Sequence, residues 1–243
     1  MDSSHLHTQN TLETCGVSIP FDRRVITPPI EQAIRANLFE AEEAAQIPKI
    51  VSQGDTVLDI GAGIGFISTL LARQPEVERV VAVEANPDLM PFMAKLHDLN
   101  GVENIERMNV ILTNDASSEM TFYQRKDFWM GSLMAGPNAF ETRVQVKTSN
   151  LDRFLNDQKI TLIVCDIEGA ESVIFRDADL SGVDRLYLEL HDHITGLKGI
   201  HAVFTQMGEK GFAYDPRSSS GAIVLFRRVQ ENEVLRPYAR GES

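Results

Sequence analysis

Short apolar runs alternate with amphipathic segments along most of this chain, and this alternation predicts strands that alternate with helices. Apolar runs of strand length occupy residues 56–60, 79–83, 109–112, 162–166 and 184–191. Apolar residues at helical spacing occupy residues 30–45, 66–71, 86–99 and 199–210. Runs that are apolar throughout are typical of parallel strands buried on both faces. We therefore expect an α/β protein with a mostly parallel sheet and helices on both faces.

The last two apolar runs, 211–214 and 222–226, are joined by a loop rich in Ser and Gly. This loop is too short for a crossover helix, so the two runs are expected to form an antiparallel hairpin at the end of the sheet. A second antiparallel pair is expected between residues 120–123 and 142–146. The loop between them holds the only tryptophan, Trp129. A large apolar side chain in a loop either packs on a sheet edge or lines a pocket, and both remain open.

The chain length favours one domain with flanking segments. Residues 1–50 are expected to form an N-terminal arm and a cap helix. Within them, the polar residues 1–26 predict either a loosely structured arm or a flap over the site, and the helix is expected to end before Pro48. Residues 51–229 form the predicted main domain, and residues 230–243 form a charged tail that is expected to be frayed.

The strand at 56–60 ends in a turn with three alternating glycines, Gly61, Gly63 and Gly65. Without a Cβ, a ligand can approach the main chain at the positive end of the following helix. Glu84 ends the next strand, at the distance where an acid can accept hydrogen bonds from both ribose hydroxyls. The pattern therefore predicts a cofactor that contains adenosine. Phe66 stands where the dinucleotide fingerprint has glycine or alanine, which weakens the case for a nicotinamide cofactor.

Composition and charge narrow the class of protein. The net charge is −12 and the isoelectric point is about 4.9, with no cluster of Lys and Arg, so we expect no nucleic-acid partner. Two cysteines, Cys15 and Cys165, do not suggest a disulfide framework. No secretion signal and no window of membrane-span length is evident. A cytoplasmic protein is expected.

Several motifs together resemble the FkbM family of S-adenosylmethionine-dependent methyltransferases over about residues 55–228. The motifs are Asp59-x-Gly61-x-Gly63-x-Gly65, Val83-Glu84-x-Asn86-Pro87, Asn109-Val110-Ile111-Leu112, and Asp166-Ile167-Glu168-Gly169-Ala170-Glu171. The resemblance implies a Rossmann-like class I methyltransferase fold, whose seven-stranded sheet ends in an antiparallel C-terminal hairpin. It also implies S-adenosyl-L-methionine as the cofactor and methyl transfer to a hydroxyl of a small molecule, sugar or lipid.

The same resemblance assigns the cofactor-binding residues. The glycine turn and Asp59 are expected at the methionyl part, Glu84 at the ribose and Asn109 near the adenine. The full expected set is Asp59, Gly61, Ala62, Gly63, Gly65, Glu84, Ala85, Asn86, Asn109, Val110 and Asp166. Because the methyl donor is a sulfonium cation that also carries an ammonium group, carboxylates such as Asp59 and Asp166 suit it.

Methyl transfer to a hydroxyl needs a group that removes its proton, and the candidates lie at strand ends, with His191 and Glu168 ahead of Glu189, Asp192 and His193. His191 ends a strand expected beside that of Asp166, and an unperturbed histidine titrates near neutrality. Glu168 could act instead, and Asp166 is expected to shape the same site. Asp166, Glu189 and His191 could in principle hold a divalent ion, but no spacing rule marks a metal site, so none is expected.

Two other functions share part of this pattern. A nicotinamide-dependent oxidoreductase would use the same strand, glycine turn and acid, but the chain has no Tyr-x-x-x-Lys pair. A nucleoside-binding protein without catalysis would use Glu84 and the glycines, and it would not need acids and His191 at the ends of later strands. Neither the acceptor nor the oligomeric state follows from these patterns.

Overall fold

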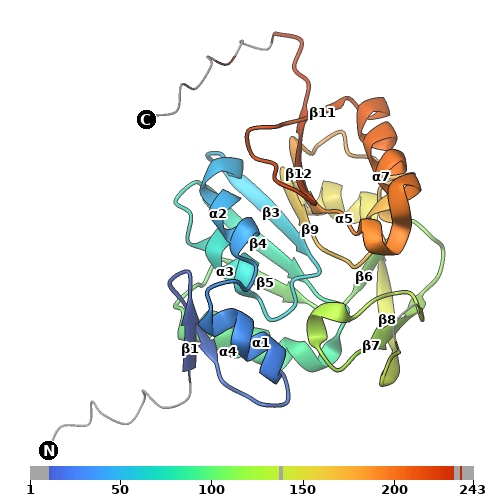
Figure 1. Cartoon of the computed structure of the whole chain (residues 1–243). Coiled ribbons are helices and arrows are strands. Elements are labelled where there is room, and N and C mark those ends of the chain that lie inside the picture. The colour runs from blue at the N-terminus through green and yellow to red at the C-terminus, as the bar shows by residue number, and fades with distance from the viewer. Residues whose placement is uncertain (1–10, 137–138, 233–235, 237–243) are drawn as a thin grey trace, which may run out of the picture.

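The computed structural model describes residues 11–136, 139–232 and 236. Its central feature is a seven-stranded sheet with the order β11-β12-β10-β9-β3-β4-β5 (Figure 1). The strands are β3 (Asp55–Ile60), β4 (Val77–Val83), β5 (Ile105–Met108), β9 (Leu162–Cys165), β10 (Arg185–Glu189), β11 (Phe212–Tyr214) and β12 (Ile223–Arg228). All pairs are parallel except those made by β12, which is antiparallel to both β10 and β11.

This order confirms the expected Rossmann-like class I methyltransferase fold, including the antiparallel C-terminal hairpin. An all-parallel dinucleotide-binding sheet has no place for β12. The strand order reverses beside β3, whose neighbours are β4 and β9. In open α/β sheets the ligand binds outside the carboxyl ends of the strands at this switch point. The fold therefore places the cofactor next to the glycine turn that follows β3.

Helices cover both faces of the sheet, as Figure 1 shows for α2 and α3 on one side and α7 on the other. Neighbouring residues of β3 point in opposite directions, so that Val57 joins one apolar cluster and Leu58 the other. Both are completely buried. The helices are α1 (Pro28–Arg35), α2 (Ala41–Ile50), α3 (Phe66–Ala72), α4 (Met90–Leu99), α5 (Leu151–Gln158), α6 (Glu171–Ile174) and α7 (Asp192–Glu209), with short 3₁₀ turns η1 (Pro87–Leu89) and η2 (Phe128–Met130).

The N-terminal segment is more ordered than expected. Residues 11–20 form a hairpin of β1 (Thr11–Thr14) and β2 (Val17–Pro20), so the prediction of a loosely structured arm is wrong for this part. Alternation explains the hairpin, because Val17 and Ile19 point inward and are fully buried. The amide of Asn100 donates to the Ser18 carbonyl over 2.7 Å and ties the hairpin to α4. Residues 1–10 lie outside the described residues.

The expected cap helix is in fact two helices, α1 and α2. Asn37 and Glu40 have φ values of 55° and 46°, and this left-handed backbone ends α1 and redirects the chain into α2. The second helix also continues through Pro48, against expectation, because Ile47 and Ile50 on its last turns are buried in the core. The break at Glu40 brings the start of α2 to the cofactor side of the sheet.

The third parallel strand lies earlier than predicted, at β5 rather than at residues 109–112. The run at 109–112 instead contributes β6 (Ile111–Thr113) to a separate sheet with the order β6-β8-β7. In that sheet, β7 (Glu119–Gln124) pairs with β8 (Thr142–Asn150) in the antiparallel arrangement expected from the sequence. Asn109 therefore directly follows the end of β5, next to the cofactor edge.

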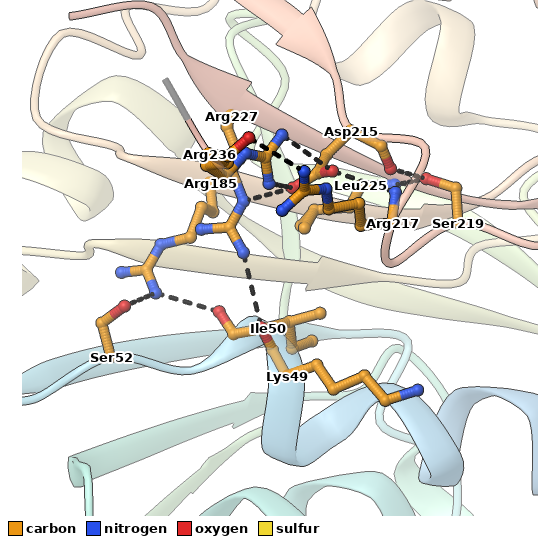
Figure 2. Close-up of polar contacts among 10 residues, drawn as sticks. All are labelled: Lys49, Ile50, Ser52, Arg185, Asp215, Arg217, Ser219, Leu225, Arg227 and Arg236. Carbon is orange, nitrogen blue, oxygen red and sulfur yellow. Dashed lines mark hydrogen bonds and ion pairs between the residues drawn. The ribbon is translucent and has the colours of Figure 1, made fainter. Parts of the chain in front are cut away.

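Figure 2 shows how α2 is fixed to the amino ends of the strands. The Arg185 guanidinium donates to the Ile50 carbonyl over 2.9 Å and to Ser52, and it pairs with buried Asp55 over 2.6 Å. On β12, Arg227 donates to the Lys49 carbonyl of α2 over 3.4 Å and is itself held by the buried carboxylate of Asp215 over 2.6 Å. These contacts anchor the C-terminal end of α2, so its other end is held over the cofactor edge.

The structure describes only part of the C-terminal tail, and it also bears on the prediction about membrane spans. Of the expected frayed tail, residues 233–235 and 237–243 lie outside the described residues. Within the described part of the chain, none of the helices has the length and apolar character needed to cross a membrane.

Candidate active site

The turn between β3 and α3 is pressed against two neighbouring elements. Gly61 and Gly65 have φ values of 85° and 87°, a conformation that favours glycine. A Cβ on Gly61 would lie 1.8 Å from the backbone oxygen of Asp166, and a Cβ on Gly65 would lie 2.5 Å from Nε2 of His97. These two glycines are therefore required by packing against β9 and α4.

Gly63 also has a left-handed backbone, with a φ value of 53°, but it is packed less tightly than Gly61 and Gly65. The nearest atom to a Cβ there would belong to the ring of Phe128, at 3.3 Å. The Gly63 N–H donates to Oε2 of Glu84 over 2.8 Å. Gly63 lines a cavity of about 220 Å³ at the carboxyl ends of β3, β4 and β9. This is the position that the switch-point rule gives for a ligand.

The cavity collects a large part of the predicted site. Of the predicted residues, those lining it are Gly61, Gly63, Glu84, Ala85, Val110, Asp166 and Glu168. Gly65 and His191 line neither this cavity nor the smaller neighbouring one, which Asp59 and Ala62 line together with Asp166. The structure thus brings most predicted residues to one edge of the sheet, in two adjoining spaces.

Glu84 is buried at the end of β4 with both carboxylate oxygens held in place. Oε1 accepts from the Asn86 N–H over 2.6 Å, and Oε2 accepts from Gly63. Burial raises the pKa of Glu84 to about 7, although the hydrogen bonds from Asn86 and Gly63 oppose this rise. A carboxylate oxygen can accept more than one hydrogen bond, so each oxygen retains capacity for a ribose hydroxyl.

The two predicted asparagines hold the backbone around Glu84. The Asn109 amide donates to the carbonyls of Glu84 and Ala85 over 2.8 and 3.0 Å. The Asn86 side chain caps η1 by accepting from the Asp88 N–H over 3.1 Å. Neither asparagine lines the main cavity, whereas Val110 does. Their observed contacts position the loop at the adenine side of the expected cofactor.

Asp59 is almost completely buried, with 3% of its surface exposed. Its Oδ2 atom has no hydrogen-bond partner among the described residues. Burial, together with the charge of Glu84, raises the pKa of Asp59 to about 7. An unpartnered buried carboxylate oxygen is costly, and a bound cationic group would satisfy it. The ammonium group of S-adenosylmethionine has this character.

An acidic cluster surrounds His191, the residue that precedes α7. Its Nδ1 contacts Oε1 of buried Glu171 at 2.9 Å. Its Nε2 lies 3.4 Å from Oδ1 of Asp166 and 3.7 Å from Oε2 of Glu168. The structure therefore brings together the three predicted catalytic residues. Glu171, which the sequence motif contains without a predicted role, orients the imidazole.

The surroundings of His191 change its expected chemistry. Burial lowers its pKa, but the hydrogen bond with Glu171 and the charge of Asp166 outweigh burial and raise the pKa to about 9. The imidazole of the cofactor-free protein is thus protonated at neutral pH, so the expectation of a neutral base with an unperturbed pKa is wrong for this state. Burial raises the pKa of Glu168, which lines the cavity. Asp166 is 44% exposed, so solvent moderates the effect of burial on its carboxyl group.

An aromatic group closes the cavity on the side of the cap. Trp129 stacks on Phe39 with a centroid distance of 6.2 Å, and Phe128 lies edge-on to Phe39 at 6.4 Å. A hydrogen bond from Thr27 to Asp127 joins the cap to this loop. Both alternatives for Trp129 hold, because it packs on the core and also lines the cavity. The sequence predicted a cap helix, but it did not single out Phe39 and Glu40, which the backbone break before α2 brings to this side.

Comparisons with known proteins place this geometry in a class. Residues 34–130 match a family model described as the TRM5/TYW2 methyltransferase domain. An uncharacterised protein of Methanocaldococcus jannaschii is 26% identical over 141 residues, which are 55% of this chain and 52% of that protein. A Methanosarcina acetivorans protein named "Probable ribosomal RNA small subunit methyltransferase A" is 38% identical over 101 residues, or 35% of this chain and 36% of that protein. The chain thus spans about half or less of these relatives.

Solved structures with a similar fold include Trm5b from Pyrococcus abyssi, with a TM-score of 0.49 and 15% identity over 88% of this chain and 54% of that chain. Another is TYW2 of M. jannaschii in complex with AdoMet, with a TM-score of 0.48 and 13% identity over 92% of this chain and 90% of that chain. The fold assignment itself rests on the strand order.

Strand order, glycine turn and family-model match define the class: the chain carries an S-adenosylmethionine-dependent methyltransferase domain of the class I fold. Within this class, the matching model is that of the TRM5/TYW2 domain, so the resemblance to the FkbM family is wrong. The expectation of a small-molecule acceptor and no nucleic acid is also contradicted, because the names of relatives refer to RNA. A net charge summed over the chain does not describe how charged groups are distributed, as the arginines gathered around Asp215 in Figure 2 illustrate.

Proposed function

We propose that this protein transfers a methyl group from S-adenosylmethionine to a nucleotide of an RNA. The observation that carries the proposal is that half-buried Phe128 and Trp129 line the same cavity as the carboxylates of Asp166 and Glu168. Enzymes that modify a base take it out of its stack, receive it against aromatic side chains and read its edge by hydrogen bonds. The matching TRM5/TYW2 model and the names of the Methanosarcina relatives support RNA as the acceptor.

The cofactor is proposed to extend along the glycine turn. Its ribose hydroxyls donate to Glu84, which the Gly63 and Asn86 amides already hold in place. Its adenine lies beside Ala85 and Val110, in the part of the cavity that the Asn109 amide supports from behind. The predicted cofactor-binding residues thereby keep their roles as proposals.

The methyl group is then presented toward the part of the cavity near Glu168. In-line transfer requires close alignment of the sulfonium methyl and the acceptor atom, and alignment is the main contribution of the protein. Asp166 and Glu168 both line the cavity and approach His191, but only Asp166 also lines the smaller cavity beside Asp59, so we assign the acceptor proton to Glu168. His191 is proposed as a positioning residue, because its imidazole contacts the carboxylates and lies outside the main cavity.

The direct test incubates the protein with S-adenosylmethionine carrying a labelled methyl group and with separate transfer and ribosomal RNA fractions. The expected result is label in RNA that ribonuclease releases, with the methylated nucleotide identified by mass. Glu168→Gln should lose about 10²–10⁴ in rate while it retains the cofactor. Asp157→Asn, which removes an exposed carboxylate on α5, is the matched control. Label in protein or small molecules but not in RNA would overturn the proposed acceptor.

A further inference from the structure

A second cavity lies behind the glycine turn, between the ends of β3, β9 and β10 and the start of α2. Its polar lining consists of Glu40, Glu43, Asp59, Asp166, Tyr187 and Glu189. Five of these six residues are carboxylic acids, and none of the lining residues is a lysine or arginine. A concentration of acids in a small enclosed space is unfavourable unless a cation or protons balance it.

Two buried groups in this cavity lack partners, which points to a ligand. Oδ2 of Asp59 and the hydroxyl of Tyr187 form no hydrogen bond with any part of the chain that the structure describes. The two residues are only 3% and 1% exposed, respectively. Buried polar atoms in proteins are nearly always satisfied, because leaving them unsatisfied costs free energy. Tyr187 and Glu189 stand two positions apart on β10 and therefore point to the same face.

The ligand atoms needed for a metal ion are already close together. One oxygen each of Asp166 and Glu189 and one nitrogen of His191 all lie within 4.8 Å of one another. Two ligands on opposite sides of one ion are about 4.2–5.2 Å apart for oxygen ligands at 2.1–2.6 Å. The three atoms can therefore contact a single ion after small adjustments.

His191 also has the orientation of a metal ligand. Its Nδ1 is engaged by buried Glu171 at 2.9 Å, and this leaves Nε2 directed toward Asp166 at 3.4 Å. In a metal site, the ring nitrogen of a histidine that does not bind the metal usually donates a hydrogen bond to a carboxylate. This hydrogen bond fixes the tautomer and the orientation of the ring. Glu171 is itself 2% exposed, so the arrangement is built into the core of the site.

The cofactor alone does not balance this charge. Its ammonium group supplies one positive charge, which Asp59 suits, while the same cavity is also lined by Glu40, Glu43, Asp166 and Glu189. A divalent ion held by Asp166 and Glu189 would balance more of this charge and would lie between the ends of β9 and β10.

We propose that Asp166, Glu189 and His191 bind a divalent cation of the Mg²⁺ or Mn²⁺ type, with Asp59 and the Tyr187 hydroxyl beside it. A mostly oxygen ligand set with one imidazole suits these ions. Asp166 lines both cavities, so the ion lies at the boundary between the acid-lined space and the main cavity. The inference does not depend on the identity of the acceptor.

The test titrates the metal-free full chain with Mn²⁺, without cofactor, and follows the paramagnetic resonance signal of the free ion. The wild type should bind one Mn²⁺. Glu189→Gln should weaken binding by at least about tenfold, and Glu171→Gln should weaken it by about 10–100-fold, the usual effect of losing an outer-shell partner. Glu209→Gln removes one exposed carboxylate at the far end of α7 and should bind like the wild type.

Circular dichroism melting checks that each variant is folded. If Glu189→Gln is not folded, the more conservative variant Glu189→Asp replaces it in the titration. Three results would overturn the proposal. The first is no saturable Mn²⁺ binding by the wild type up to about 1 mM, the weak end of the range for protein cation sites. The second is equal binding by wild type and both Glu189 variants. The third is complete loss of Mn²⁺ binding when S-adenosylmethionine is added, which would assign the cavity to the ammonium group of the cofactor.

Discussion

Replacing Glu84 by alanine should weaken the binding of S-adenosylmethionine without unfolding the domain. Glu84 ends β4 inside the cavity, and its two oxygens accept from Asn86 and Gly63 over 2.6 and 2.8 Å. Removing the carboxylate therefore removes the proposed acceptor of both ribose hydroxyls. It also leaves the Gly63 and Asn86 amides without their present partner, and water in the cavity can replace that partner at Gly63, which lines the cavity.

The size of the effect follows from the kind of hydrogen bond that is lost. A hydrogen bond to a charged group contributes about 1.5–3 kcal/mol. This range corresponds to a dissociation constant that rises by about 10- to 150-fold. Glu78→Gln is the matched control, because Glu78 is an exposed acid on the same strand. The control should bind the cofactor as tightly as the wild type.

Calorimetric titration with S-adenosylmethionine and with its 2′-deoxy analogue tests the reasoning. In the wild type, removal of the 2′-hydroxyl should cost affinity, and in Glu84→Ala the same removal should cost little more. If the variant loses as much affinity on deoxygenation as the wild type does, Glu84 does not contact the ribose. Unchanged affinity of Glu84→Ala for S-adenosylmethionine would refute the assignment altogether.

Three further predictions concern the turn, the aromatic wall and pH. Gly61→Ala should destabilise the fold by about 1–3 kcal/mol, because its Cβ meets the backbone of Asp166 at the end of β9. Gly63→Ala should cost less stability and should mainly weaken cofactor binding. Denaturant melts measure the loss of stability, and calorimetry measures the loss of cofactor affinity. Trp129→Ala should raise the KM for RNA by about 5- to 150-fold, the loss of one stacked base, with cofactor affinity unchanged. The cofactor-free protein should lose stability as the pH rises from about 4.5 to 7, because Glu84 and Asp59 hold protons in the folded state that they release in the unfolded chain. Asp59→Asn should flatten this pH dependence of stability, and a melting temperature that rises between about pH 4.5 and 7 would contradict the prediction.

The sequence predicted the sheet well because its apolar runs are long and unambiguous. The buried strands β3, β4, β9 and β10 all fall within or near the predicted ranges. The glycine turn and Glu84 were found for the same reason, since a strand, a turn and an acid at fixed spacing form a local pattern. The antiparallel hairpin of β11 and β12 followed from the shortness of its loop.

Non-local contacts explain what the sequence did not predict. The break between α1 and α2 depends on left-handed Glu40, which no propensity rule anticipates. The third strand was misplaced because β5, an edge strand with exposed Glu106 and Arg107 in its middle, has no apolar run, whereas residues 109–112 do. The protonation of His191 could not be predicted, since Glu171 and Asp166 reach it only after folding.

The acceptor was mispredicted for a different reason. The exclusion of nucleic acid rested on the net charge of −12, which is a property of the whole chain. Local groups decide recognition, and the arginines around Asp215 show that positive side chains gather on part of an acidic protein (Figure 2). The aromatic wall formed by Phe128 and Trp129 is likewise invisible until the cap and the loop before β8 come together.

The central claim is that the cavity above the glycine turn is built for S-adenosylmethionine. Calorimetric titration of the purified chain with S-adenosylmethionine, S-adenosylhomocysteine and NAD tests this claim most directly. We predict saturable binding of one molecule of each of the first two ligands and none of NAD, with S-adenosylmethionine binding weakened in Glu84→Ala. Binding of NAD in preference to S-adenosylmethionine, or no binding of S-adenosylmethionine by the folded chain, would contradict the account.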